Sequence, residues 1–225
     1  RLNWVHPGVN DPHAWEAVRG NETVLPEVLK RGLRMLWGGH TFQTWIPNDR
    51  YFDAHPEYFA LVNGKRLPQE NFQGGLCLSN TRMQREVASN ILRFAKENPG
   101  IEAFDLWMND TEDWCECDDC THFEGEADYE RYPEFLRFAG VPQQARAYFT
   151  FVNNVARLVR AENPDIILSP LAYARSYEPP NELKTEPNVF VGFTNFLRTR
   201  NRCLLDPEDA RNAAFVETIT RWQGH

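Results

Sequence analysis

The sequence predicts an α/β fold of the (β/α)8 TIM-barrel type, in the form of a partial or truncated barrel with long loops after its strands. Two observations predict this class. Amphipathic helices alternate with segments of strand length, and those segments are nearly continuous apolar runs, as is typical of parallel strands covered by helices. A doubly wound open sheet would show the same alternation. About five such units in 225 residues are too few for a complete barrel of about 250 residues, so we expect one incomplete barrel domain over 1–225.

An internal repeat supports the alternation. The segment Glu-Asn-Pro occurs at 97–99 and again at 162–164, each time between a helical pattern and a strand pattern. Proline ends a helix and shifts the preceding residue toward an extended conformation. Apolar residues define one helical face before each breaker, formed by Met83, Val87, Ile91, Phe94 and Ala95 in the first unit and by Phe149, Val152, Val155, Ala156 and Val159 in the second. Strands are predicted to follow at 101–108 and 166–173.

The remaining elements continue the pattern. A helix is predicted near 11–30, strands at 1–6, 33–37 and 188–193, and a last helix at 207–222. Two long loops, at about 41–80 and 111–142, follow the carboxyl ends of strands. In parallel α/β folds this is where sites form, and long insertions there are often functional.

Composition limits the function classes. The chain is 42% hydrophobic and 13% aromatic, enough for a sizeable core, and its net charge of −8 argues against a nucleic-acid or anionic-membrane partner. No apolar run is long enough for a transmembrane helix. The first residues are not a signal peptide, and we expect the chain to be a fragment, which leaves secretion or a periplasmic location open. Oligomeric state is also left open.

The sharpest polar cluster is Asn109-Asp110, at the end of an apolar strand. We expect the Asp110 carboxyl to be partly desolvated there, which would raise its pKa and suit a general acid. Glu112 and Asp113 offer a second carboxylate, as glycoside hydrolysis generally requires, and Asn109 could bind a substrate hydroxyl or amide. The alternative is that Asn-Asp only starts a turn and caps a helix.

Other strand ends carry polar and aromatic residues that would form a rim for a polyhydroxylated ligand. These are His40, which follows two glycines, and Trp107, Tyr173, Arg175 and Asn195. Each alone fits a structural role as well. Flat rings match the apolar faces of sugars, but we expect at least half of the strand-end aromatics to be mainly buried; the set is Trp37, Phe42, Trp45, Trp107, Trp114 and Tyr173.

A cysteine motif predicts a structural zinc site. Cys115, Cys117 and Cys120 form C-x-C-x-x-C, which brings three sulfurs close enough to share one ion, and tetrahedral zinc needs a fourth ligand. Cys77 in the other long loop is the preferred fourth ligand, and His122 is the alternative. Free thiols, or a disulfide from Cys77 to one of the three, are the competing interpretations. Cys203 has no evident partner, and no organic cofactor is expected.

Several of these motifs together resemble a bacterial family catalogued as a domain of unknown function, family 4838. The matching segments are 38–42, 51–66, 76–80, 109–110, 114–120, 151–156 and 171–173, spread over nearly the whole chain. The family is similar to barrel glycosidases that include α-glucuronidases and β-hexosaminidases, and its members typically carry a further amino-terminal domain. The resemblance implies a β/α barrel that acts on glycans.

The resemblance also implies roles for single residues. In hexosaminidases an Asp-Glu pair follows the fourth strand, so Asp110 falls at the acid position and Asn109 at the orienting one. Asn in place of Asp puts a substrate-assisted mechanism in doubt. His55, in the matching His-Pro-Glu-Tyr-Phe stretch, has either a sugar-binding or a loop-packing role.

The resulting hypothesis is a glycoside hydrolase with a carbohydrate ligand and Asp110 as the acid. Two alternatives use the same scaffold: a glycan-binding module without catalysis, and a zinc-stabilised module that contacts protein.

Overall fold

The computed structural model describes residues 4–7, 14–70, 74–122, 144–180, 182–195 and 198–224. Four short parallel strands form the central sheet in the order β1 (Trp4–Val5), β2 (Arg34–Trp37), β5 (Ile101–Asp105) and β6 (Ile167–Ser169). A second parallel pair, β7 (Leu171–Ala172) and β8 (Gly192–Phe193), begins two residues after β6. No helix among the described residues is long and apolar enough to cross a membrane.

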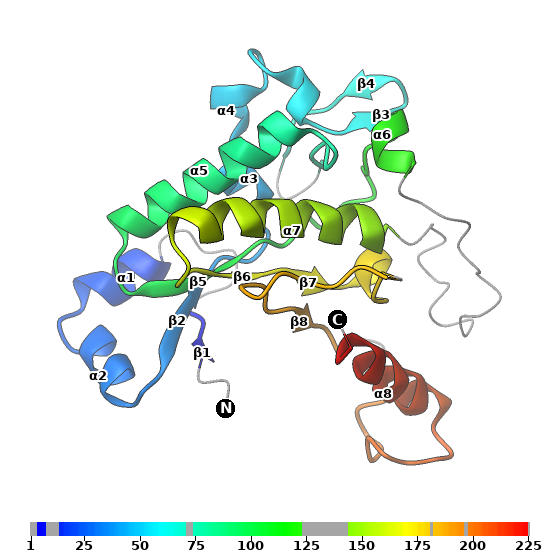
Figure 1. Cartoon of the computed structure of the whole chain (residues 1–225). Coiled ribbons are helices and arrows are strands. Elements are labelled where there is room, and N and C mark those ends of the chain that lie inside the picture. The colour runs from blue at the N-terminus through cyan, green and yellow to red at the C-terminus, as the bar shows by residue number, and fades with distance from the viewer. Residues whose placement is uncertain are drawn as a thin grey trace.

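Helices connect the parallel strands, as Figure 1 shows. Between β1 and β2 lie α1 (Ala14–Gly20) and α2 (Val24–Lys30), and α8 (Ala210–Trp222) ends the described chain. The long helices α5 (Thr81–Glu97) and α7 (Ala145–Glu162) lead into β5 and β6 and pack side by side. The loop after β2 holds α3 (Phe42–Trp45), α4 (Asn48–Tyr51), η1 (Pro56–Tyr58) and a hairpin of β3 (Leu61–Val62) with β4 (Lys65–Arg66); α6 (Asp118–Thr121) follows β5, and η4 (Ala174–Ser176) follows β7.

The core lies between the sheet and the two long helices. Trp37 on β2 and Phe104 on β5 both contact Phe94 of α5, with ring centroids 4.5 and 6.0 Å apart. The predicted helical faces are confirmed, because eight of their ten residues are fully buried, namely Met83, Val87, Ile91, Phe149, Val152, Val155, Ala156 and Val159. Phe94 and Ala95 are only partly buried against this core.

Two expectations about the fold need correction, and a third is confirmed in part. The helix predicted near 11–30 is two helices, because the side chain of Asn21 accepts hydrogen bonds from the backbone N–H groups of Thr23 and Val24 and starts α2 anew. The strand predicted at 166–173 is split at Pro170, which has no N–H to give to a ladder. The described strands form an open sheet, so parallel α/β alternation is confirmed while barrel closure stays a prediction.

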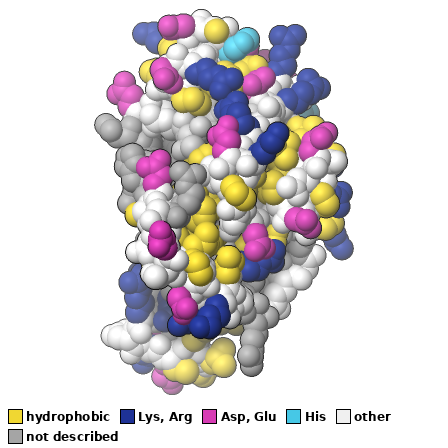
Figure 2. Space-filling view, turned by 90° about the vertical axis from the view of Figure 1, so that its left-hand side faces the viewer, with side chains coloured by type: hydrophobic (Ala, Val, Ile, Leu, Met, Phe, Trp, Pro, Cys, Tyr) yellow, Lys and Arg dark blue, Asp and Glu magenta, His cyan; other side chains and the backbone are white. Residues whose placement is uncertain are grey.

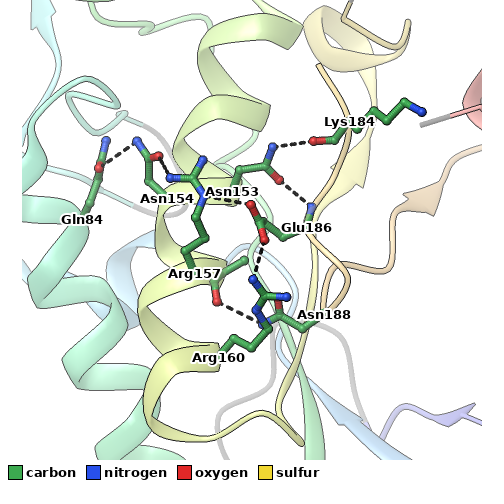
Figure 3. A network of polar contacts seen from close by, with 9 residues as sticks. Gln84, Asn153, Asn154, Arg157, Arg160, Lys184, Glu186 and Asn188 are labelled. Atoms are coloured by element: carbon green, nitrogen blue, oxygen red, sulfur yellow. Dashed lines mark hydrogen bonds and ion pairs between the residues drawn. The ribbon is translucent and has the colours of Figure 1, made fainter. Parts of the chain in front are cut away.

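A polar network fastens the segment 184–188 to α7 (Figure 3). The Asn153 side chain donates to the Lys184 carbonyl at 2.8 Å and accepts from the Glu186 N–H at 2.9 Å. The Glu186 carboxylate pairs with Arg157 at 2.8 Å and with Arg160 at 3.1 Å. Because this segment leads into β8, the network fixes where the last strand begins.

The surface carries charges of both signs. Figure 2 shows Lys and Arg interspersed with Asp and Glu on one face, with hydrophobic side chains exposed between them. This face is therefore mixed in charge rather than uniformly acidic.

Gly38 allows β2 and β5 to approach closely at their carboxyl ends. It has φ of +140°, and a Cβ placed there would lie 2.6 Å from the Cβ of Asp105 and 3.1 Å from its backbone nitrogen. The contact brings the segments that follow the two strands together.

Replacing Gly38 with Ala should lower the free energy of unfolding by about 2–4 kcal/mol, since a positive φ and a steric clash act together. Chemical denaturation of the variant measures the change. Gly20→Ala is the matched control, because no atom lies within 4 Å of the added Cβ and its φ is not in the strained region. Equal stability of the two variants would contradict the proposed close approach.

Candidate functional site

The segments that follow β2, β5 and β6 meet at the carboxyl end of the central sheet, where β7 begins. His40, after β2, forms a parallel bridge with Trp107, after β5, and its Nδ1 hydrogen-bonds to the carbonyl of Met108. The buried hydroxyl of Tyr148 on α7 donates to the Leu106 carbonyl at 2.7 Å and accepts from the Leu171 N–H at 3.2 Å. These bonds hold the three strand ends beside one another, as the parallel topology predicts.

A cavity of about 180 Å³ opens at this edge and contains the main predicted residues. It is lined by 108–112, Trp114 and 173–175. The segments on its two sides follow β5 and β7, which are more than sixty residues apart in sequence. The structure thus brings Asn109, Asp110 and Glu112 together with Tyr173 and Arg175.

Asp110 faces Tyr173 across this cavity. The pKa of the Tyr173 hydroxyl is raised, first by burial and then by the charge of Asp110 and its hydrogen bond to that carboxylate. Asp110 itself is exposed, so the expectation that it is partly desolvated is wrong for the free protein. The reason is that β5 ends at Asp105, five residues earlier, and the chain has left the sheet before it reaches Asp110.

The second predicted carboxylate, Glu112, is held by an ion pair at the rim. Arg175 Nη2 lies 2.5 Å from Glu112 Oε2; the arginine side chain is 11% exposed and the glutamate 77%. The Arg175 guanidinium carbon lies 5.6 Å from the centre of the Trp114 ring. Arg175 is therefore positioned between a carboxylate and an aromatic face.

Asp113, the other predicted carboxylate, lies in a neighbouring part of the loop. It does not line the cavity that holds Asp110 but a smaller hollow beside it, with Gly75 and Leu76. A Cβ on Gly75 would lie 2.5 Å from the Asp113 carbonyl oxygen, so the two loops are in close backbone contact here.

Asn109 serves to join these loops. Its side chain is 2% exposed, and its Nδ2 donates to Gln69 Oε1 and to the Gly74 carbonyl, both at 2.8 Å. Both N–H groups of this amide therefore bind within the protein, and the predicted sugar contact of Asn109 stays a prediction. Gln69 is fully buried and also donates to the Ile46 carbonyl.

Four predicted binding residues do not line the cavity. His40 and Trp107 lie edge to face, with ring centroids 5.9 Å apart, at the base of the strand ends. Asn195 is exposed beyond β8. His55 stacks on Tyr58 at 4.7 Å, a contact that favours its loop-packing role.

Half of the strand-end aromatics are buried, as expected. Trp37, Phe42 and Trp45 are at most 4% exposed, whereas Trp107, Trp114 and Tyr173 are half-buried. Of the second group, Trp114 and Tyr173 reach the cavity.

Sequence reasoning missed a buried acid at the end of β5. Asp105 is fully buried, and its Oδ2 lies 2.9 Å from His6 Nε2. Burial is the main cause that raises the pKa of Asp105, and the hydrogen bond with His6 opposes it. The signal in the sequence is a carboxylate that follows two apolar residues at the end of a buried strand.

The four predicted cysteines form one cluster. The sulfur of Cys77 lies 3.6 Å from that of Cys117 and 4.0 Å from that of Cys120, and all four sulfurs, with Cys115, lie within 4.8 Å of one another. Hydrogen bonds from Cys115 and Cys120 lower the pKa of the Cys77 thiol. His122 is exposed and outside this group, and so is Cys203.

Fold and site together define an open parallel α/β domain with polar strand ends and a four-cysteine cluster. The chain belongs to the family described as Domain of unknown function (DUF4838), whose model matches residues 3–224. No curated protein matches it.

Three solved structures are similar at low identity. The first is a β-galactosidase from Rahnella sp., with 14% identity and a TM-score of 0.40, and the match covers 75% of this chain and 31% of that one. The second is a GH36 α-galactosidase from Geobacillus stearothermophilus in complex with stachyose, with 15% identity and a TM-score of 0.33, and the match covers 65% of this chain and 18% of that one. The third is a family GH13_31 enzyme, with 12% identity and a TM-score of 0.42, and the match covers 98% of this chain and 49% of that one. This chain spans less than half of each. None of the three is named as an α-glucuronidase or β-hexosaminidase, so that relation stays a prediction.

Replacing Asp105 with Asn should stabilise the protein relative to wild type as the pH rises. The unfolded chain releases this proton near 3.8, whereas the buried group keeps it to higher pH, so the wild type loses stability as the pH passes through this interval. Across this interval, we expect the unfolding free energy of the variant to rise relative to that of the wild type by about 1.4 kcal/mol for each unit by which the pKa is raised.

Denaturation from roughly pH 3.5 to 7 measures this trend. Asp209→Asn is the control of opposite sign, because the Asn212 N–H lowers the pKa of Asp209, whose stabilisation is lost as the pH falls. A pH-independent difference for Asp105→Asn would contradict the assignment.

Proposed function

We propose that this domain binds a carbohydrate in the cavity at the strand ends and, as part of a glycoside hydrolase, supplies Asp110 as the acid. The observation that carries the proposal is the meeting of Asp110 and Tyr173, from different strands, in one cavity with Trp114. A sugar ring presents hydroxyl groups at its edge and C–H groups on its faces. This cavity offers a carboxylate, a phenol and an indole to match them.

The size of the cavity indicates the extent of the ligand. Pockets for drug-sized molecules occupy about 300–1,000 Å³. At about 180 Å³, this cavity is below that range and fits one sugar ring rather than several. The rest of a longer glycan would extend into solvent or onto other parts of a longer protein.

The exposure of Asp110 defines what the ligand has to do. A general acid must hold its proton until the leaving oxygen takes it, and desolvation favours the protonated form. Because Asp110 is open to water in the free protein, a bound ring that covers it would supply this desolvation. Tyr173 keeps the carboxyl oriented toward the cavity.

Glu112 is the companion carboxylate of the proposed hydrolysis. Of the two candidates for this role, Glu112 lines the same cavity as Asp110, whereas Asp113 does not line it. Its ion pair with Arg175 fixes its position at the rim. The proposed reaction gives Asp110 the proton transfer and Glu112 either the activation of water or attack on the sugar carbon.

A glycan-binding module without catalysis is the second candidate. The exposure of Asp110 and the engagement of Glu112 with Arg175 favour it, since both carboxylates have partners or water in the free protein. It requires binding at the same cavity and no hydrolysis.

Replacing Asp110 with Asn should lower turnover by about 10²- to 10⁴-fold, because the amide cannot donate the required proton. Hydrolysis screens of the full-length protein and the variant measure this effect on any glycan the wild type cleaves. Asp53→Asn, an exposed acid outside the cavity, is the control. Undiminished turnover would end the acid assignment, and sugar binding without hydrolysis by the wild type would establish the second candidate.

Replacing Tyr173 with Phe should weaken sugar binding by about two- to tenfold, the loss expected for one hydrogen bond of about 0.5–1.5 kcal/mol. Isothermal titration with a sugar identified on a glycan array measures the affinity. His55→Ala is the control, because His55 packs on Tyr58 away from the cavity. Equal effects of the two substitutions would place the sugar elsewhere.

A further inference from the structure

We propose that Cys77, Cys115, Cys117 and Cys120 bind one Zn²⁺ through four thiolates, and that this ion fixes one wall of the cavity. The metal site rests on the cysteines alone, independently of the proposed sugar. Four sulfurs at the tetrahedral corners around one zinc, each about 2.3 Å from it, lie about 3.8 Å apart. The sulfur of Cys77 lies 3.6 and 4.0 Å from those of Cys117 and Cys120, and no pair in the cluster exceeds 4.8 Å.

These distances distinguish an ion site from a crosslink. A disulfide requires about 2.05 Å between sulfurs, and all four residues are free cysteines. Three of the four are buried and the fourth is half-buried, so the cluster is closed to substrate. A closed set of four thiolates is typical of structural zinc.

The surroundings suit a negatively charged centre. Four thiolates outweigh the charge of one Zn²⁺, so the site needs hydrogen-bond donors and a nearby cation. Arg66 Nη1 lies 3.7 Å from the sulfur of Cys115, and the backbone N–H of Leu61 donates to the same sulfur at 3.4 Å. The Ser79 hydroxyl lies 3.2 Å from the sulfur of Cys120 and 3.5 Å from that of Cys77.

The ligands come from two loops that follow different strands. Cys77 belongs to the segment after β4, and the other three belong to the segment after β5. Cys115 directly follows Trp114, which lines the cavity, and Gly75 touches the Asp113 backbone. An ion at the cluster would therefore join the two loops next to the cavity wall. The hydrogen bond from the Asn109 side chain to the Gly74 carbonyl joins the same two loops at a second point.

Metal content is the direct test. The full chain, purified under reducing conditions and supplied with zinc alone, should retain about one zinc per chain by mass spectrometry of the metal. Cys77→Ser should reduce zinc affinity by more than the about 10- to 100-fold typical of outer-shell substitutions. Cys203→Ser is the matched control, because Cys203 is exposed and outside the cluster, and it should retain the metal.

Two further measurements keep the test decisive if Cys77→Ser does not fold. Cobalt(II) added to the wild type should give the sulfur-to-metal charge-transfer bands of a tetrahedral thiolate site, and Cys117→His should keep metal with shifted bands. Zinc removal should speed amide exchange in 74–80 and 113–122 and leave that of α7 unchanged. A wild type that takes up no zinc, holds iron instead or contains a disulfide among these cysteines would overturn the proposal, whatever the outcome for sugar binding.

Discussion

The hydroxyl of Tyr148 joins the two strand ends between which the cavity opens. This hydroxyl donates a hydrogen bond to the carbonyl of Leu106 and accepts one from the N–H of Leu171. Tyr148 belongs to α7, and its side chain is fully buried. Both bonds lie where water cannot replace them, so losing them would leave buried backbone groups unpaired at a cost of about 1–3 kcal/mol each. This side chain from a helix thus sets where the segment with Asp110 and the segment with Tyr173 leave the sheet, and the ion pair of Glu112 with Arg175 joins them again at the rim.

Local sequence patterns were sufficient to predict the alternating helices and strands. The faces of α5 and α7 follow from apolar spacing, because burial on one side of a helix requires that spacing. The breaks at Asn21 and Pro170 were missed, because an apolar pattern does not reveal them. Asn21 acts through two hydrogen bonds from its side chain to the backbone, and Pro170 acts through one that it cannot make. Closure of a sheet depends on pairing between distant strands and does not follow from the periodicity of any one segment.

The outline of the candidate site could also be predicted from the order of helices and strands. Parallel strands place their carboxyl ends at one edge, which is enough to bring Asp110 near Tyr173. The partner of Asn109 was not predictable, since Gln69 lies forty residues away and its position is set by the packing of the loop after β2. The spacing of the cysteines was the strongest local signal, because sulfur atoms two to five residues apart can meet without help from the rest of the fold.

The polar network on α7 affects how the protein responds to ionic strength. The ion pairs of Glu186 with Arg157 and Arg160 involve partly exposed arginines and are weakened when dissolved ions screen them. The hydrogen bonds from the side-chain amide of Asn153 to the same segment join uncharged groups and are insensitive to such screening. The segment that leads into β8 is thus held by ion pairs that depend on ionic strength and by hydrogen bonds that do not. High salt would weaken the contacts of the two arginines, while the hydrogen bonds would keep β8 in position.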